Sequence, residues 1–268
     1  MIDEVGELLR EAAARTVLPW FNQLSAEHIV EKAPGDLVTI ADQQAEEFVA
    51  AGLRRLLPGS VVVGEEAVSV DDHLLRRLRD GGRVWLVDPI DGTANFAAGR
   101  RPFVMMVALL DAGVPVASWI LDPIVGSLAV AERGAGCVVD GVRLADGVSG
   151  ESPPLGKLRG ALALRYLPDE LRARVLAGVD GLGVVLPGQH CAGREHWDIA
   201  TGEQDFALFW RTLPWDHVPG TLLVREAGGV ARRLDGSPYD YTDDRPGLLV
   251  ARSEAAWQEL REALLPAD

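Results

Sequence analysis

The sequence contains little cysteine, little basic charge and no long apolar run. It has 2 cysteines among 268 residues, Cys137 and Cys191, and they are not spaced as a CxxC pair. Two cysteines are too few for a disulfide framework, which fits a reducing compartment. The apolar run PFVMMVALL ends at Asp111, well short of the roughly 18 residues that a membrane-spanning helix needs. We therefore expect a protein that does not cross a membrane.

Acidic side chains outnumber basic ones, 40 to 26, so the formal net charge at pH 7 is −14. Such a surface repels nucleic-acid backbones and anionic lipid, and no strong basic patch offsets it, so we expect neither as a partner. The amino-terminal stretch MIDEVGELLREAAAR lacks the basic start and the unbroken apolar core of a signal peptide. We therefore expect no cleaved leader and a cytoplasmic location.

The first half of the chain is predicted to combine two helices with an antiparallel sheet. Apolar residues at helical spacing predict a helix over 3–20, closed by Pro19, and a second helix that starts at Asp42 and ends at Pro58-Gly59. Beyond this helix short apolar runs alternate with turn residues, and Asp111-Ala-Gly between two of them predicts a hairpin. The strands are expected at 61–63, 84–87, 103–110, 114–121, 128–131 and 137–139.

The second half is predicted to alternate strands with helices. A stretch rich in Gly, Ser and Pro, 146–157, is the expected hinge between an N-terminal half, 1–145, and a C-terminal half, 146–268. Past the hinge, strands are expected at 161–164, 183–186, 206–210 and 248–251, and helices at 170–177, 195–201, 216–227 and 253–264. The predicted fold class is therefore α+β in the first half and α/β in the second.

The strongest functional signal is the string WLVDPIDGTANF at 85–96. Asp88 ends an apolar strand, Pro89 cannot continue a central ladder, and Asp91 precedes a flexible glycine. Together with the carbonyl of Ile90, the two carboxylates offer the hard oxygen ligands that Mg²⁺ prefers. An Asp-Pro turn followed by an Asp-Gly turn is the purely structural alternative. The whole string favours a cation site.

Residues around these aspartates extend the signal. Backbone N–H groups of Gly92 and Thr93 would face an anion if a helix or turn begins there, and a phosphate suits that place. Glu65 and Glu66 follow the apolar strand at 61–63, and Asp216 follows Pro-Trp before a helix pattern. Taken alone, these acids favour solvated loop residues and a helix N-cap. The coexistence of all three segments favours a metal and phosphate site.

The sequence resembles the inositol monophosphatase family, a Mg²⁺-dependent, lithium-sensitive phosphatase superfamily. The motifs that carry the resemblance are GEE at 64–66, WLVDPIDGTANF at 85–96 and WDHVPGTLLVREAGG at 215–229, in the family's order, and the segment 32–42 is similar to its N-terminal segment. The resemblance implies the layered α-β-α-β-α sugar-phosphatase fold, with an antiparallel N-terminal sheet and a mixed C-terminal sheet. It also implies two or three Mg²⁺ ions, a small phosphorylated metabolite as partner and a homodimer.

The same resemblance assigns roles to single residues. It implies that Asp88 bridges two cations and that Thr93 and Glu65 orient and deprotonate the attacking water, which makes these three the catalytic residues. The implied metal ligands are Glu65, Asp88, the Ile90 carbonyl, Asp91 and Asp216, and the implied substrate-binding residues are Asp91, Gly92, Thr93 and Asp216. By the same likeness, Asp36, Thr39 and Asp42 fall in a mobile loop near the metals, and Lys32 adds a nearby charge.

Two departures from the family pattern concern the substrate. The family's Gly-Ser/Thr-Ala-Ala stretch is replaced by HCAGREHWD at 190–198, and Phe209 stands where many inositol-directed members have a glutamate that contacts substrate. Inositol itself is therefore in question, whereas the phosphate and metal residues are intact. Arg165, Arg194 and Arg211 are candidates for a second anionic group, with surface or ion-pair roles as the alternative.

The expected activity is Mg²⁺-dependent hydrolysis of a small phosphomonoester, an inositol monophosphate or a related sugar or polyol phosphate, by metal-activated water. Alternatives in the same superfamily are a 3′(2′),5′-bisphosphate nucleotidase, a fructose-1,6-bisphosphatase and a histidinol-phosphatase. A non-catalytic metabolite-binding protein is the alternative outside enzymes, and retention of all five ligands together with Thr93 argues against it.

Overall fold

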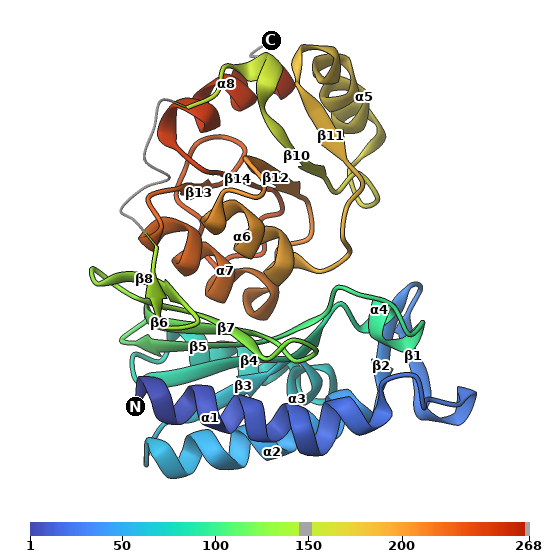
Figure 1. The fold of residues 1–268 in the computed structure, drawn as a ribbon, viewed down its shortest axis with the longest axis vertical. Coiled ribbons are helices and arrows are strands. Elements are labelled where there is room, and N and C mark those ends of the chain that lie inside the picture. The colour runs from blue at the N-terminus through green and yellow to red at the C-terminus, as the bar shows by residue number, and fades with distance from the viewer. Residues whose placement is uncertain (145–151, 266–268) are drawn as a thin grey trace.

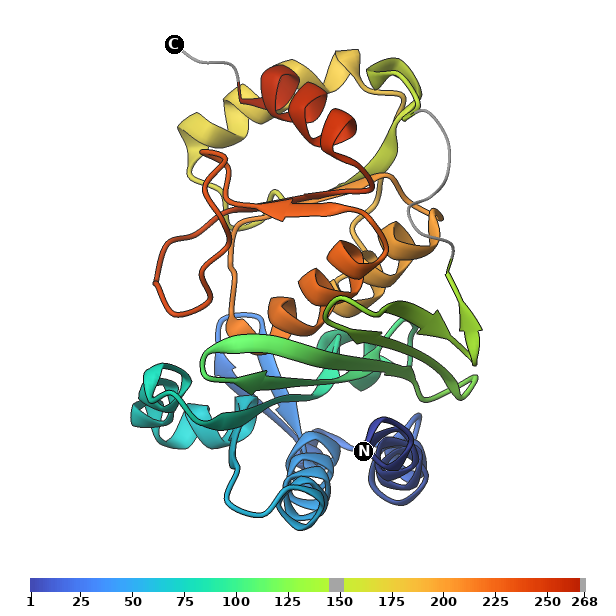
Figure 2. The ribbon, with the colours of Figure 1, turned by 90° about the vertical axis from the view of Figure 1, so that its left-hand side faces the viewer.

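The structure, a computed structural model, describes residues 1–144 and 152–265. Five layers follow one another along the long axis: helices, a sheet, helices, a second sheet and helices (Figures 1 and 2). This arrangement confirms the predicted α-β-α-β-α fold. Within the described residues, no helix is long and apolar enough to cross a membrane.

The first layer contains α1 (Ile2–Ala12) and α2 (Ile40–Leu56). The predicted helix over 3–20 is α-helical only as far as Ala12, after which a π-type turn (Ala13–Val17) and a 3₁₀ turn (Leu18–Trp20) follow. The second helix begins two residues earlier than predicted because Thr39 caps it. The Thr39 side chain accepts a hydrogen bond from the Ala41 N–H, and Asp42 accepts one from the Thr39 N–H.

The first sheet has seven strands in chain order, and all six strands predicted for this half are confirmed. They are β3 (Val61–Gly64), β4 (Arg83–Asp91), β5 (Val104–Asp111), β6 (Val114–Asp122), β7 (Ser127–Glu132), β8 (Gly136–Val139) and β9 (Val142–Arg143). Neighbouring strands are antiparallel except β3 and β4, which run parallel at one edge. The connection between these two strands contains the short helices α3 (Glu65–Val70) and η4 (Asp72–Arg79).

The second sheet is mixed and has the order β11 (Val184–Leu186), β10 (Arg159–Leu162), β12 (Phe206–Phe209), β14 (Leu248–Ala251) and β13 (Val230–Arg232). Helices α6 (Ala192–Thr201) and α7 (Pro214–Glu226) lie between the two sheets, and α5 (Asp169–Gly178) and α8 (Glu254–Leu264) cover the far face (Figure 2). The predicted alternation of strands and helices is confirmed. The expected hinge, 146–157, lies partly outside the described residues.

One core cluster joins the two halves of the chain. Val104 and Met106 of the first sheet belong to the same buried cluster as Trp197 of α6 and Trp215 and Leu222 of α7. The boundary at 145/146 stays a prediction.

Several short elements were not predicted. A hairpin, β1 (Ile29–Ala33) and β2 (Asp36–Thr39), turns at Pro34-Gly35, where a turn was expected, and it lies beside α4 (Thr93–Ala97) (Figure 1). Short 3₁₀ turns are formed by Ala26–His28, Leu155–Lys157 and Val179–Gly181. Elements of three or four residues leave too little periodicity to be read from a sequence.

Candidate active site

Three carboxylates from distant parts of the chain meet at one point. Carboxylate oxygens of Glu65, Asp88 and Asp216 all lie within 4.8 Å of one another. Glu65 is the first residue of α3, directly after β3, and Asp88 lies near the end of β4. Because β3 and β4 are parallel, their carboxyl ends meet at the same edge of the sheet. Asp216 is the third residue of α7, and Leu213 rather than Asp216 holds the N-cap position.

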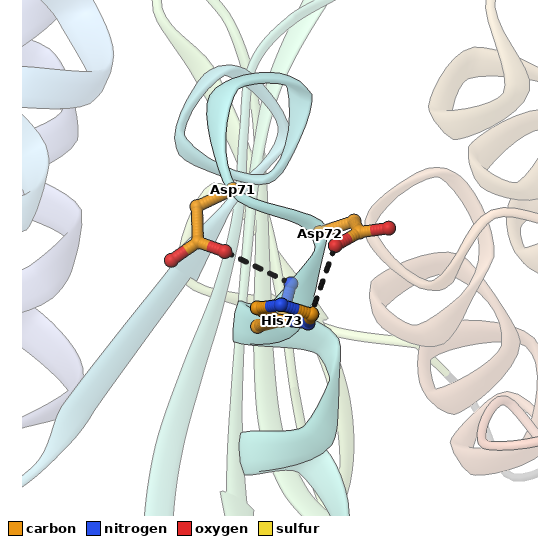
Figure 3. Close-up of side chains that lie close together, drawn as sticks. All are labelled: Asp71, Asp72 and His73. Atoms are coloured by element: carbon orange, nitrogen blue, oxygen red, sulfur yellow. Dashed lines mark hydrogen bonds and ion pairs between the residues drawn. The ribbon is translucent and has the colours of Figure 1, made fainter.

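A second acidic group, formed by Asp71, Asp72 and His73, is of a different kind (Figure 3). All three residues are exposed. Asp71 accepts a hydrogen bond from the His73 N–H at 3.1 Å, and an Asp72 oxygen lies 3.4 Å from the His73 ring. The contacts are those of an ordinary helix cap at the start of η4.

A β-bulge brings the two aspartates of β4 to the same face of the sheet, although they are three residues apart. Asp88 is opposite Met106 and Asp91 is opposite Val104, so β4 has one extra residue between the two pairs. Pro89 lies in the bulge and has no N–H to leave unpaired. Asp91 is consequently turned toward the start of α6.

Asp91 holds the amino terminus of α6. Its carboxylate accepts hydrogen bonds from the N–H groups of Gly193 at 2.6 Å and Ala192 at 3.1 Å, and from the Cys191 thiol at 3.2 Å. Burial outweighs these contacts and raises the pKa of Asp91 to about 6. Asp91 therefore lies beside the three-carboxylate group rather than in it, although each carboxylate oxygen has room for a second partner.

The pKa of Asp88 is strongly perturbed. It is 2% exposed, and its Oδ1 has no hydrogen-bond partner among the described residues. Burial, followed by the charges of Glu65 and Asp91, raises the pKa of Asp88 well above its usual range. Burial likewise raises the pKa of Asp216. Buried oxygens with unmatched negative charge and hard-ligand chemistry fit a divalent cation.

Thr93 is held between two oxygen atoms. Gly92 adopts a left-handed conformation, φ 93°, and is the N-cap of α4, which begins at Thr93 as the sequence suggested. The Thr93 Oγ1 lies 2.8 Å from the Ile90 carbonyl oxygen and 3.0 Å from Asp42 Oδ1. A hydroxyl has one proton, so it donates to one of these acceptors at a time.

Asp42 lies in the first turn of the helix that the apolar spacing predicted to start there, and the structure adds its contact with Thr93. The resemblance put it in a mobile loop, but it lies in the first turn of α2, is 1% exposed and contacts Thr93. The loop prediction was wrong because the Thr39 capping box starts the helix at Ile40. Burial raises the pKa of Asp42 to about 6.

A lysine from the β1–β2 hairpin neutralises part of the acidic group. The Lys32 ammonium lies 2.9 Å from Glu65 Oε1 and 3.0 Å from Glu66 Oε1. Burial alone would lower the pKa of Lys32, but the two carboxylates raise it overall. Burial and the charge of Glu65 raise the pKa of Glu66 to about 7.

Sequence reasoning missed Glu46, which supports the site from behind. Its two carboxylate oxygens accept hydrogen bonds from the N–H groups of Glu66 and Ala67, each at 2.8 Å, and so hold the start of α3. Glu46 is buried on α2, four residues after Asp42. That spacing places both acids on one face of the helix, which is the signal that could have found it.

A cleft of about 330 Å³ is lined by Glu65, Asp88, Asp91, Thr93 and Asp216, and the two unusual segments contribute to its lining. Residues 190–198 form the start of α6 and the loop before it, and Phe209 ends β12. Of the three candidate arginines, Arg194 pairs with Asp198 at 2.7 Å, and only Arg165 and Arg211 line the cleft.

The comparisons with known proteins cover the whole chain. A model of the inositol monophosphatase family matches residues 1–267. An inositol-1-monophosphatase of Mesorhizobium japonicum is 32% identical over 263 residues, which cover 94% of this chain and 91% of that protein. One of Bacillus subtilis is 28% identical over 251 residues, with coverage of 92% and 91%.

Solved structures show the same fold. The crystal structure of the extragenic suppressor protein suhB from Bartonella henselae matches with a TM-score of 0.81 at 24% identity, over 98% of this chain and 99% of that one. Together with the carboxylate geometry, these similarities show that the chain belongs to the inositol monophosphatase family, a family of phosphatases.

Proposed function

We propose that this protein hydrolyses a small phosphomonoester in a Mg²⁺-dependent reaction. The observation that carries the proposal is the convergence of Glu65, Asp88 and Asp216 within 4.8 Å. Three carboxylates this close repel one another strongly in a buried site, and cations are the natural counter-charge. The unpaired Oδ1 of Asp88 supports the same conclusion.

The proposed ligands of two or three Mg²⁺ ions are Glu65, Asp88, the Ile90 carbonyl, Asp91 and Asp216. When bound, such ions neutralise the phosphate, lower the pKa of a water and stabilise the leaving alkoxide. Every other part of the reaction rests on the chain's own residues.

Thr93 and Asp42 form the proposed proton relay. The Thr93 hydroxyl, 3.0 Å from Asp42 Oδ1, donates to that carboxylate and keeps its lone pairs free to accept from the attacking water. Glu65 is proposed as the base that orients the same water. Backbone N–H groups of Gly92 and Thr93, at the start of α4, are proposed to bind the phosphate oxygens.

The proposed substrate is an inositol monophosphate or a related sugar or polyol phosphate. Two of the relatives compared above are named inositol-1-monophosphatases, whereas Phe209 and the segment 190–198 depart from the inositol-directed pattern. A bisphosphate nucleotidase, a fructose-1,6-bisphosphatase and a histidinol-phosphatase are the alternatives within this chemistry. From the family resemblance we also propose inhibition by lithium, a homodimer and a cytoplasmic location.

A phosphate-release assay tests the proposal directly. The purified chain is assayed with inositol 1-phosphate, fructose 1,6-bisphosphate, histidinol phosphate and adenosine 3′,5′-bisphosphate, with millimolar Mg²⁺ or with EDTA. We expect turnover of at least one ester in Mg²⁺ and none in EDTA. Asp88→Asn should abolish turnover, whereas the matched control Asp72→Asn, in the exposed group, should keep it. Absence of turnover on every ester, or equal rates in EDTA, would refute the proposal.

A further inference from the structure

One wall of the cleft offers almost nothing to a polyol. It is formed by the ends of two parallel neighbours, β10 and β12, and by the residues that follow β10. The lining residues here include Ala161, Ala163, Leu164, Ala207 and Phe209, all with apolar side chains, whereas the side chains of Leu162 and Leu208 pack in the core cluster that contains α8. None of them carries a hydroxyl, amide or carboxylate to hydrogen-bond a sugar hydroxyl.

The aromatic group behind this wall is uncharged. The ring of Phe209 stacks on His196 with centroids 5.2 Å apart and planes 4° apart, and it meets His217 edge-on at 4.8 Å. Burial lowers the pKa of His196 to about 4 and lowers that of His217 well below its usual value. Phe209 thus lies against two neutral imidazoles, which leaves an apolar, planar surface.

Polar side chains near the wall are already engaged. Glu195 is 4% exposed, and its two oxygens accept from the Gln189 N–H at 2.8 Å and from the Gln204 amide at 2.6 Å. His217 Nε2 donates to the Arg211 carbonyl at 3.0 Å, and only its buried Nδ1 is left as an acceptor. The cleft therefore has few side chains left to form hydrogen bonds with hydroxyl groups on the alcohol portion of a substrate.

The rim above this wall is cationic. The guanidinium carbons of Arg165 and Arg211 lie 5.1 and 5.9 Å from the ring centre of Tyr166. Arg211 pairs with Asp36 at 3.1 Å, whereas Arg165 has no carboxylate partner among the described residues. Arg211 thus has Asp36 and the nearby charge of Asp216 as counter-charges, whereas the guanidinium of Arg165 has none among the described residues.

The rim is held in place by the β1–β2 hairpin. The Arg165 guanidinium packs against Gly35, where an added Cβ would lie 2.1 Å from Nη2. The next residue, Asp36, makes the contact with Arg211. Figure 2 shows the tip of this hairpin reaching the segment that leads into α7. Contacts with the β1–β2 hairpin therefore position both arginines at the rim of the cleft.

We propose that the preferred substrate is a phosphomonoester whose alcohol portion is apolar or planar and carries a second anionic group, a carboxylate or a phosphate, bound by Arg165 and Arg211. This inference rests on the proposed phosphomonoester hydrolysis, with the scissile phosphate at the carboxylate end of the same cleft, and it replaces the polyol phosphates named there by esters of a less polar alcohol. A guanidinium presents paired N–H donors that match either anion. The second anion would supply a counter-charge for Arg165, since Asp36 pairs with Arg211.

Three esters with one scaffold test the inference. Benzyl phosphate, 4-carboxybenzyl phosphate and 4-phosphonobenzyl phosphate share an unactivated leaving group and differ only at the far end, where the phosphonate cannot be hydrolysed. We expect kcat/KM to be about tenfold higher for at least one anionic ester than for benzyl phosphate. The arm that gains identifies a carboxylate or a phosphate as the second group. Because Arg165 is exposed, the preference should shrink at high ionic strength.

Substitutions of the two arginines test whether they cause the preference for an anionic ester. Arg165→Gln and Arg211→Gln should each bring the ratio of kcat/KM between anionic and plain ester toward one. Arg54→Gln is the matched control, because Arg54 is exposed on α2, away from the cleft, and should keep the wild-type ratio. Charge reversal in Arg165→Glu should push the ratio below one.

Binding gives a readout that does not depend on turnover. Calorimetry compares benzylphosphonate with its 4-carboxy and 4-phosphono derivatives, none of which is hydrolysed, on the wild type and on Arg165→Gln. Tighter binding of an anionic derivative, lost in the variant, supports the inference. Equal binding of all three by the wild type overturns it. Absence of phosphate release from these esters and from the four esters of the Mg²⁺ assay above refutes instead the proposed function.

Discussion

Replacing Asp88 by asparagine should make the metal-free protein more stable. Changing a buried polar residue usually lowers stability, because it removes a hydrogen bond. Asp88 Oδ1 has no partner among the described residues, so the change removes charge without breaking a contact of that atom. The carboxylate oxygens of Glu65, Asp88 and Asp216 lie within 4.8 Å of one another. At that distance the repulsion between two charged carboxylates costs about 3 kcal/mol at an effective dielectric constant of 20. The wild type relieves part of this cost by retaining a proton.

We therefore expect a net gain of about 1–3 kcal/mol for Asp88→Asn in EDTA at pH 7, a rise in melting temperature of roughly 3–8 °C. Millimolar Mg²⁺ should reverse the order. A hundredfold excess over the dissociation constant should stabilise the wild type by about 2.7 kcal/mol, whereas the variant lacks one of the proposed ligands and should gain little.

Differential scanning fluorimetry of wild type, Asp88→Asn and the control Asp72→Asn, each in EDTA and in Mg²⁺, measures both effects. The control should follow the wild type in both buffers. If Asp88→Asn melts below the wild type in EDTA, then the carboxylate is satisfied within the fold and the charge argument fails. An equal Mg²⁺ shift in both proteins would remove Asp88 from the ligand set.

The pH dependence has a definite sign. Folding raises the pKa of Asp88 and raises that of Asp91 and Asp42 to about 6 and of Glu66 to about 7. An acid with a raised pKa binds its proton more tightly in the folded state, so stability is greatest below the unfolded pKa and falls as pH rises. Metal-free protein should lose stability between about pH 4 and pH 7. A flat profile in EDTA, measured by urea unfolding, would contradict this.

Further predictions concern single contacts. Asp42→Asn should lower kcat about 100-fold, because the asparagine oxygen stays with the Thr39 N–H and its NH₂ group then faces Thr93 in place of an acceptor, with a melting temperature near that of the wild type; full activity would exclude the relay. Gly92→Ala should lower the free energy of unfolding by more than the ~1–2 kcal/mol that a left-handed conformation costs, since the added Cβ would also lie 3.1 Å from a carbonyl oxygen. Gly59→Ala is the control in urea unfolding, because Gly59 also has a positive φ but open space around it. Lys32→Gln should lower stability in EDTA by about 1–3 kcal/mol. Thermal melts should show a smaller difference between variant and wild type in Mg²⁺. A constant difference would mean that Lys32 does not substitute for cation charge.

Local pattern was enough for most of the fold. Short apolar runs predicted every strand from Val61 to Val139, because each strand has one or two faces to bury and turn residues mark its ends. The start of α2 was placed two residues late, since Thr39 caps the helix through its side chain rather than by the hydrophobic period. The short β1–β2 hairpin left too few residues for a period to show.

By itself the sequence determined which acids meet the requirements of a cation site, because the bulge at Asp88 and Asp91 and the acid after β3 are encoded within a few residues. Tertiary structure alone decided what those residues touch. Asp42 lies 51 residues from Thr93, Asp91 lies 102 from Gly193, and Asp36 lies 175 from Arg211. Contacts at such separations arise from the packing of whole layers, and spacing along the chain carries no information about that packing. The acidic motifs in the sequence therefore indicated a metal and phosphate site. The apolar wall and the arginines at its rim became visible only in the folded chain.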